Sequence, residues 1–254
     1  MCGIVGYIGR RQAAPLILDG LKKLEYRGYD SFGIATLHSH IEIDKHKGRI
    51  SEYNEGIQLH GTIGIGHTRW ATHGIPNDVN AHPHTDCNNR IAIVHNGIIE
   101  NYAELKKELA AKGHIFRSET DTEVVVHLIE EEFAKTADLL SAVRGALPHL
   151  TGSYAILVIA DGADCLIAAR NGSPLVLGIG DKEYFAASDM TPVLEYTERA
   201  LFLEDGDIAC LTRNRVDIYQ GTKPVNRPVE LIDWSPEDAR KGGFPHYMLK
   251  EIYE

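Results

Sequence analysis

The stretch Met1-Cys2-Gly3-Ile4-Val5-Gly6 opens the chain and places a cysteine directly after the initiator methionine. Cysteine is small enough to permit removal of that methionine, which would leave Cys2 with a thiol and a free α-amine on one residue. A terminal amine has a pKa of roughly 7.7–8.0, so it can act as a base near neutral pH for an adjacent nucleophile. This stretch alone is equally consistent with the simple start of a buried strand. The rest of the chain has to decide between the two interpretations.

The composition indicates a globular protein and disfavours several classes of partner. The chain has 254 residues, 43% of them hydrophobic, with 26 Lys plus Arg against 36 Asp plus Glu. An acidic chain without a basic cluster is a poor candidate for binding nucleic acid or an anionic membrane. No apolar run approaches the roughly 20 residues of a membrane span, and the N-terminus lacks the form of a signal peptide. The four cysteines form no CxxC pair, so we expect neither a disulfide framework nor a thiolate zinc site, and a cytoplasmic location.

The hydrophobic periodicity predicts strands on both sides of a central helical block. Helices are expected over residues 11–24, 101–113, 120 onward and 138–147, with capping-box spacing in the pairs Asn101/Glu104 and Thr120/Glu123. Strands are expected over residues 3–8, 31–37, 63–68, 91–95, 153–160, 165–169, 175–179, 184–187, 208–211 and 216–219. Asn96-Gly97 is typical of a turn. Two sheets packed face to face, with helices outside, would satisfy this order.

Four further segments carry polar residues that are not typical of a packed core. They read EYRGYDS (25–31), HTRWATHG (67–74), NAHPH (80–84) followed by His95-Asn96-Gly97, and SETDTE (118–123). Each falls at a predicted strand end or helix start, where a rigid frame commonly presents binding groups. Together with Cys2-Gly3-Ile4-Val5-Gly6, these segments closely resemble the glutaminase domain of class II glutamine amidotransferases. Within this group, the sequences of these segments are most similar to those of the glucosamine-6-phosphate synthases.

The resemblance spans almost the whole chain and implies an α+β fold, the four-layer αββα sandwich of the N-terminal nucleophile hydrolases. It implies that Cys2 attacks the side-chain amide of L-glutamine, with its own α-amine as general base and then acid. A γ-glutamyl thioester and ammonia would form, and water would release glutamate. The Asn96 side-chain amide and the Gly97 backbone N–H would form the oxyanion hole, in which one lost donor typically costs roughly 10²–10³ in rate.

The resemblance also implies how glutamine is recognised. Arg69 suits the α-carboxylate, because a guanidinium can donate two parallel hydrogen bonds, and Asp121 suits the α-ammonium. Thr72 and His73 would contribute from the same loop as Arg69, and Trp70 would cap the site and gate the ammonia path. Read singly, Arg69 could be a surface ion-pair partner, Asp121 a helix-dipole residue, and Trp70 an ordinary half-buried aromatic.

Other conspicuous residues receive structural interpretations. We expect the histidines to be a hydrogen-bonded scaffold, with no metal and no cofactor, because no HExxH or CxxC accompanies them; they are His67, His73, His82, His84 and His95. Arg27 and Asp30 are expected to form a buried network that holds the site. Cys87, Cys165 and Cys210 are expected to be packing residues. Phe32 replaces a small residue of the family, and its bulk is expected to alter packing beneath the pocket.

The predicted domain organisation is a glutaminase domain over residues 1–240 and the start of a linker over 241–254. The segment from Lys223 reads as a polar, Pro-rich covering tail. In the resembling synthases two sugar-isomerase domains follow, so we expect a truncated chain that supplies nitrogen for glucosamine-6-phosphate synthesis in a homo-oligomeric full-length protein. Two alternatives stay open: a free-standing amidotransferase subunit that feeds another acceptor, and a non-catalytic glutamine sensor.

Overall fold

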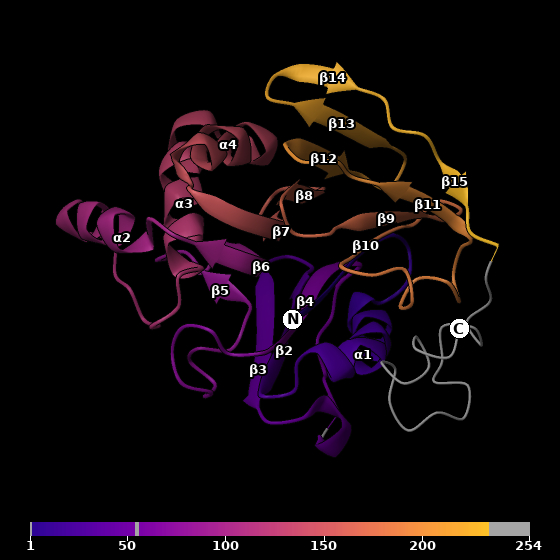
Figure 1. Ribbon diagram of the computed structural model, residues 1–254, viewed down its shortest axis with the longest axis horizontal. Coiled ribbons are helices and arrows are strands. Elements are labelled where there is room, and N and C mark those ends of the chain that lie inside the picture. The colour runs from indigo at the N-terminus through magenta and orange to yellow at the C-terminus, as the bar shows by residue number, and fades with distance from the viewer. Residues whose placement is uncertain (1, 54–55, 234–254) are drawn as a thin grey trace.

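Two large antiparallel sheets form the centre of the computed structural model, which describes residues 2–53 and 56–233 (Figure 1). In spatial order, the first sheet holds β15 (Glu230–Leu231), β11 (Arg199–Phe202), β9 (Val176–Ile179), β10 (Tyr184–Ala187), β1 (Gly3–Ile8), β4 (Ile63–Arg69), β2 (Ser31–Leu37) and β3 (Ile41–Lys47). The second holds β14 (Lys223–Val225), β13 (Val216–Gln220), β12 (Asp207–Leu211), β8 (Leu166–Asn171), β7 (Gly152–Ala160), β6 (Ile91–Ile99) and β5 (His84–Thr85).

Helices cover the outer face of each sheet. The helix α1 (Ala13–Leu24) packs on the first sheet, and α3 (Glu123–Thr136) and α4 (Leu139–Ala146) pack on the second, with α2 (Tyr102–Ala111) beside α3 (Figure 1). Three short 3₁₀ turns complete the elements: η1 (Glu25–Arg27), η2 (Ile50–Glu52) and η3 (Leu147–His149). The helices seen in the described ranges are all too short or too polar to span a bilayer. The expected four-layer αββα sandwich is confirmed.

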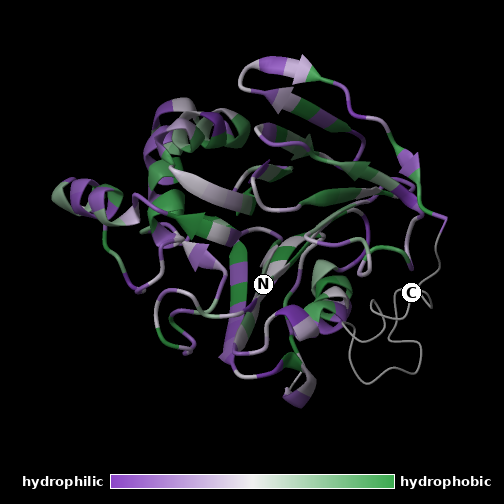
Figure 2. Cartoon of the chain, in the orientation of Figure 1, coloured by the Kyte–Doolittle hydropathy of each residue, from purple (hydrophilic) through white to green (hydrophobic). Residues whose placement is uncertain are grey.

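Three apolar layers hold the sandwich together, because alternate residues of each strand face opposite ways. On β1, Ile4 and Ile8 point to the core between the sheets, whereas Val5 and Tyr7 point to α1. Central strands such as β1, β2 and β4 are therefore buried on both faces, whereas the edge strands β14 and β15 are exposed and appear largely purple in Figure 2. Close approach of α1 to the sheet requires Gly66, since a Cβ there would lie 2.4 Å from the Ile17 Cγ2 atom.

Most of the predicted elements lie within a few residues of their observed bounds, and the exceptions have local causes. The predicted strand at residues 91–95 continues to Ile99, so Asn96-Gly97 is not a turn but part of β6. The covering-tail interpretation from Lys223 is wrong for two segments, since β14 and β15 add an edge strand to each sheet. The short strands β5 and β11 were not predicted, and β3 lies in a polar stretch for which no strand bounds were predicted. The linker predicted at residues 241–254 lies outside the described residues.

Both predicted capping boxes are wrong. The Asn101 side chain precedes α2 but donates to His149 O and accepts from Thr151 N, across to the start of β7. The Glu123 carboxylate accepts from the backbone N–H groups of Arg117 and Ser118 at 2.8 Å each, whereas the Thr120 hydroxyl contacts His84. These polar side chains therefore join neighbouring segments instead of closing their own helix ends.

Candidate active site

One pocket collects all eight residues that the sequence singled out as catalytic or substrate-binding. They are Cys2, Arg69, Trp70, Thr72, His73, Asn96, Gly97 and Asp121. Cys2 precedes β1, Arg69 ends β4, and Asn96 and Gly97 belong to β6 in the other sheet. The pocket therefore lies where corresponding ends of the two sheets meet, and we call it the Cys2 pocket.

The Cys2 sulfur is held by the backbone at the end of β4. The Trp70 N–H donates to Sγ at 3.2 Å, and Sγ lies 3.6 Å from the Trp70 carbonyl oxygen, which can accept the thiol proton. Burial raises the pKa of the Cys2 thiol, and the Trp70 N–H only partly offsets this effect. The thiol is therefore protonated at neutral pH, so its use as a nucleophile requires a base.

The Asn96 side chain is oriented by His67, which lies on β4 of the other sheet. Its Nδ2 donates to the Cys2 carbonyl oxygen at 3.0 Å, which places this amide beside the cysteine. Its Oδ1 lies 3.0 Å from His67 Nε2, which also lies 3.0 Å from the carbonyl oxygen of His95. Because His67 Nε2 must donate to these oxygens, the contact fixes which end of the Asn96 amide faces Cys2.

Gly97 occupies a backbone conformation that only glycine tolerates. Its φ is +134°, and a Cβ atom would lie 2.0 Å from the Ser153 carbonyl oxygen. The Asn-Gly pair therefore reflects a local distortion of β6 at the pocket, not the hairpin turn that it usually marks.

Arg69 is buried, with only 4% of its surface exposed, so the surface ion-pair interpretation is wrong. Its Nη2 donates to the carbonyl oxygens of His73 and Gly74, which anchors the loop after β4. Its Nη1 is buried and has no hydrogen-bond partner in residues 2–53 and 56–233. A buried guanidinium nitrogen in a pocket, with donors unused, is suited to an anionic ligand.

Asp121 lines the same pocket as Arg69 and is also 4% exposed. Its Oδ2 accepts from the Ile99 N–H at 2.8 Å, and its Oδ1 lies 4.0 Å from His73 Nδ1. Asp121 precedes α3 by two residues and anchors the end of β6, so a helix-dipole role does not account for its contacts. Thr72 and Trp70 are exposed, and Trp70 meets Tyr29 edge-on with ring centroids 5.3 Å apart.

The histidines around the pocket are a neutral, buried scaffold. Burial lowers the pKa of His67 to about 3 and lowers the pKa values of His82, His84 and His95 as well. Hydrogen-bond partners lie 2.9 Å from His95 Nδ1, at the Thr122 hydroxyl, and 3.0 Å from His84 Nε2, at the Thr120 hydroxyl. The prediction of a hydrogen-bonded scaffold is confirmed for His67, His84 and His95, whereas the buried Nδ1 of His82 has no hydrogen-bond partner among the described residues. His73 differs, because it lines the pocket half-buried.

Two expectations about supporting residues need correction. Arg27 and Asp30 are half-buried and act separately: Arg27 pairs with Asp189, and Asp30 accepts from the N–H of Ala71. Phe32 does not lie beneath the pocket. It is 1% exposed and packs in the outer layer under α1, against the rings of His46 and Tyr53.

Several pocket residues carried no signal in the sequence. Ser188, at the end of β10, accepts the Ile4 N–H at 3.1 Å through its hydroxyl. Ser173 and Pro174 line the same pocket from the loop before β9. Their positions at strand ends are the only local feature that could have indicated them.

Comparisons with known proteins agree with this geometry. The sequence model of the glutamine amidotransferase domain matches residues 67–195, which is half of the chain and includes most of the pocket. The chain belongs to the glutamine amidotransferase domain family.

Two similar relatives are much longer than this amidotransferase domain. The chain is 53% identical to a glutamine–fructose-6-phosphate aminotransferase (isomerizing) of Thermococcus kodakarensis and 55% identical to one of Thermus thermophilus. All of this chain is covered, against 43% and 42% of those proteins, so the chain spans about two fifths of their length.

Solved structures support the amidotransferase fold independently of the sequence model. A glutamine phosphoribosylpyrophosphate amidotransferase from B. subtilis superposes with a TM-score of 0.76 at 28% identity. The match covers 89% of this chain and 50% of that one. A class-II glutamine aminotransferase domain protein from Silicibacter pomeroyi shares the fold at 14% identity and a TM-score of 0.52.

Proposed function

We propose that this domain hydrolyses the side-chain amide of L-glutamine to glutamate and ammonia through a thioester on Cys2. The observation that supports this most strongly is the convergence of Cys2, Asn96, Gly97, Arg69 and Asp121 on one pocket of a glutamine amidotransferase domain. These residues come from both sheets and from the loop before α3, so simple packing does not account for their meeting.

The first half-reaction uses the groups around the sulfur. Removal of Met1 frees the Cys2 α-amine, which takes the thiol proton as Sγ attacks the amide carbon. The negative charge develops on the amide oxygen, where the Asn96 Nδ2 and the Gly97 N–H donate. The amine then returns the proton to the leaving nitrogen, and ammonia departs. In the second half, the same amine activates a water that attacks the thioester and releases glutamate.

Two charged groups select the amino-acid end of the substrate. The Nη1 atom of Arg69, which has no hydrogen-bond partner among the described residues, is available to the α-carboxylate, and the Asp121 carboxylate is available to the α-ammonium. Thr72 and His73 complete the wall, and Trp70 closes the rim, where its exposed ring is free to cover a bound substrate. The reaction as written needs no cofactor and no metal.

We further propose that the ammonia serves the amination of fructose-6-phosphate by sugar-isomerase domains, giving glucosamine-6-phosphate. Supporting this finer assignment are the names of the relatives and the two fifths of their length that this chain covers. Four free cysteines among the described residues fit a reducing cytoplasm. The homo-oligomeric state and the domain boundary near residue 240 stay predictions.

The decisive test is the intact mass of the purified chain before and after treatment with 6-diazo-5-oxo-L-norleucine, a reactive glutamine analogue. We expect loss of Met1 and a single adduct that maps to Cys2, with protection by excess glutamine. Cys165→Ala is a matched control, because it removes a thiol outside the pocket and should label normally. A retained Met1, or labelling elsewhere, would contradict the proposal and favour the glutamine sensor.

A further inference from the structure

A second cluster of reactive side chains lies outside the Cys2 pocket. It consists of Cys87, His114, His127 and Glu130, and we call it the Cys87 cluster. One ligand-type atom from each side chain lies within 4.8 Å of the other three. Cys87 belongs to the turn between β5 and β6, His114 follows α2, and the other two lie on α3, so three separate segments meet here.

The distances within the cluster match a tetrahedral zinc site. His114 Nδ1 and His127 Nδ1 are 3.2 Å apart, and the Cys87 sulfur lies 3.7 Å from each. Glu130 Oε2 lies 2.9 Å from His114 Nδ1 and 3.0 Å from His127 Nδ1. Bonds of about 2.0–2.1 Å to nitrogen and about 2.3 Å to sulfur at tetrahedral angles place ligand atoms roughly 3.3–3.6 Å apart. The observed values fall within a few tenths of an ångström of this range.

Hydrogen bonds among the four side chains do not by themselves explain the arrangement of the Cys87 cluster. The carboxylate oxygen Glu130 Oε2 faces both imidazole Nδ1 atoms and the Cys87 backbone N–H, at 3.3 Å. If both Nδ1 atoms donated to it, two N–H groups would converge at 3.2 Å beside a thiol. A dication at the centre removes this conflict, because a thiolate, a carboxylate and two neutral imidazoles all present lone pairs to it.

The surroundings supply the outer contacts that zinc ligands usually have. His114 Nε2 lies 3.6 Å from Glu131 Oε1, and His127 Nε2 lies 3.9 Å from Glu123 Oε1. The Ile115 N–H points at the Cys87 sulfur at 3.5 Å. Carboxylates behind the ligating imidazoles orient the rings and raise their basicity. His127 Nε2 is buried without a hydrogen-bond partner in the described part of the chain, so a small shift toward Glu123 would satisfy it.

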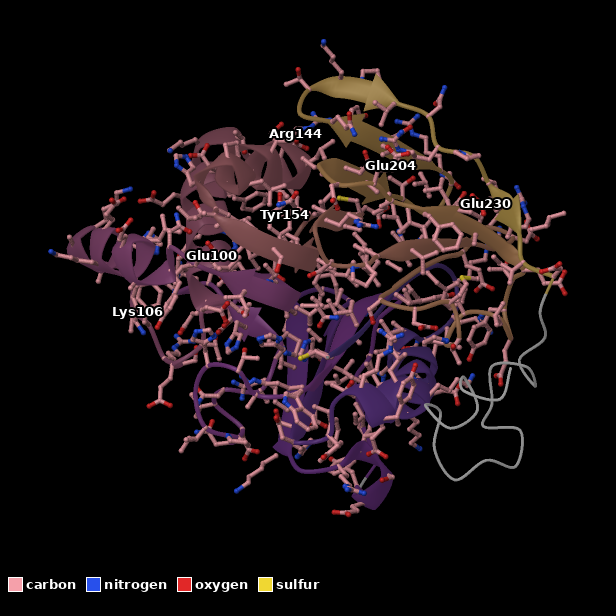
Figure 3. The ribbon with its side chains drawn as sticks, viewed as in Figure 1. Glu100, Lys106, Arg144, Tyr154, Glu204 and Glu230 are labelled. Atoms are coloured by element: carbon pink, nitrogen blue, oxygen red, sulfur yellow. The ribbon has the colours of Figure 1, made fainter. Side chains whose placement is uncertain are left out.

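We propose that the Cys87 cluster is a structural Zn²⁺ site with four protein ligands. The donor set of one sulfur, two nitrogens and one oxygen suits zinc, and the thiolate and carboxylate charges balance the dication. Four protein ligands leave no open position, so the metal stabilises the fold and does not take part in chemistry. It clamps the segment between α2 and α3. Lys106, labelled on α2 in Figure 3, also holds this segment by donating to Ser118 O at 3.2 Å.

The metal content of the full chain tests this proposal directly. We expect about one zinc per chain by elemental mass spectrometry after incubation with Zn²⁺ and removal of unbound metal. Co²⁺ in its place should give the intense visible bands of tetrahedral cobalt and a thiolate-to-cobalt charge-transfer band. Adding Zn²⁺ to the metal-free chain at a 100-fold excess over Kd should raise Tm by about 5–10 °C.

Matched variants separate this site from adventitious binding. Cys87→Ala should abolish the charge-transfer band, whereas Cys165→Ala, which removes a half-buried cysteine elsewhere, should preserve it. Glu131→Gln leaves all four ligands in place and should weaken zinc affinity by about 10–100-fold, which keeps the test informative if Cys87→Ala does not fold. A zinc content below one tenth per chain, or a charge-transfer band that survives Cys87→Ala, would overturn the proposal.

Discussion

The Cys2 pocket and the Cys87 cluster use the same residue types in opposite ways. Each holds a cysteine close to histidines, yet the Cys2 sulfur faces the backbone at Trp70, whereas the Cys87 sulfur faces two imidazole nitrogens at 3.7 Å. In the pocket, His67 Nε2 donates to the Asn96 side-chain oxygen and the His95 carbonyl oxygen. In the cluster, two Nδ1 atoms share one carboxylate oxygen.

This difference shows that what an imidazole nitrogen faces decides its role. In the pocket, the neutral His67 ring donates to Asn96 and the His95 ring contacts the Thr122 hydroxyl, so both rings are engaged away from the Cys2 sulfur. The cluster nitrogens point at one another and at a thiol, which suits a cation between them. The proposed nucleophile and the proposed zinc ligand thus differ in what their sulfur atoms face within one domain.

Replacing Cys2 with alanine should separate these roles most sharply. Cys2→Ala removes the nucleophile and should lower the rate of glutamine hydrolysis by an amount on the order of 10⁶, as in other enzymes with covalent nucleophiles. Ammonia release measures this. The same variant should keep full zinc content, because Cys2 lies outside the Cys87 cluster. Hydrolysis near the wild-type rate in Cys2→Ala would refute the proposed chemistry.

Asn96→Ala tests the donor that His67 orients. Loss of one oxyanion donor should lower kcat by about 10²–10³, with little change in KM for glutamine. Steady-state kinetics of glutamate formation measure both constants. Asn101→Ala serves as the control, because this asparagine bonds His149 and Thr151 away from the pocket and should leave kcat intact. An equal fall in kcat in both variants would show that the substitutions had only lowered the stability of the fold.

Arg69→Lys tests recognition of the substrate carboxylate. Lysine keeps the charge but cannot present two parallel donors, and a hydrogen bond to a charged group contributes about 1.5–3 kcal/mol. KM for glutamine should therefore rise roughly 10- to 150-fold while kcat changes less. Arg170→Lys, on an exposed ion pair with Asp205, is the matched control and should leave KM unchanged. An unchanged KM in Arg69→Lys would remove Arg69 from the binding site.

The fold was largely predictable because its central strands are buried on both faces. Residues 3–8, 31–37 and 184–187 were predicted with the observed bounds, since apolar runs ended by polar or turn residues leave little choice. The short edge strands β14 and β15 lack such runs, because an edge strand pairs through its backbone and buries few side chains. Both capping boxes failed because tertiary partners took the side chains that local capping would have used.

The pocket and the cluster differ in how visible they are in sequence. The pocket residues stand in compact motifs, so the resemblance groups all eight from the amino-acid sequence alone. The ligands of the Cys87 cluster lie on three segments, and Cys87 and His127 are 40 positions apart. Only the packing of α3 against the turn after β5 brings them together. Because no CxxC or HExxH motif links these ligands, the sequence gives no sign of the site, and Cys87 alone resembles a packing residue.

Acid should weaken the fold through the neutral pocket histidines, and His67 offers the clearest measurement. Burial lowers its folded pKa to about 3, whereas an unfolded histidine has a pKa of about 6.5. Below pH 6.5 His67 is protonated in the unfolded chain but stays neutral in the folded chain. Its contribution to the free energy of unfolding is therefore complete above about pH 6.5 and is lost as pH falls toward about 3. Between pH 7 and pH 5 it removes about 2 kcal/mol from the free energy of unfolding.

His67→Gln keeps an N–H donor near Asn96 but cannot be protonated. Between pH 7 and pH 5, its free energy of unfolding in urea should therefore fall by about 2 kcal/mol less than that of the wild type. The control is His149→Gln, which replaces an exposed histidine; its free energy of unfolding should fall by as much as that of the wild type. Acid release of zinc from the Cys87 cluster affects all three proteins alike, so it cancels in the comparison. A His67→Gln profile that parallels the wild type would mean that the folded His67 takes up a proton between pH 7 and pH 5 as readily as the unfolded chain does, which would contradict a low pKa caused by burial.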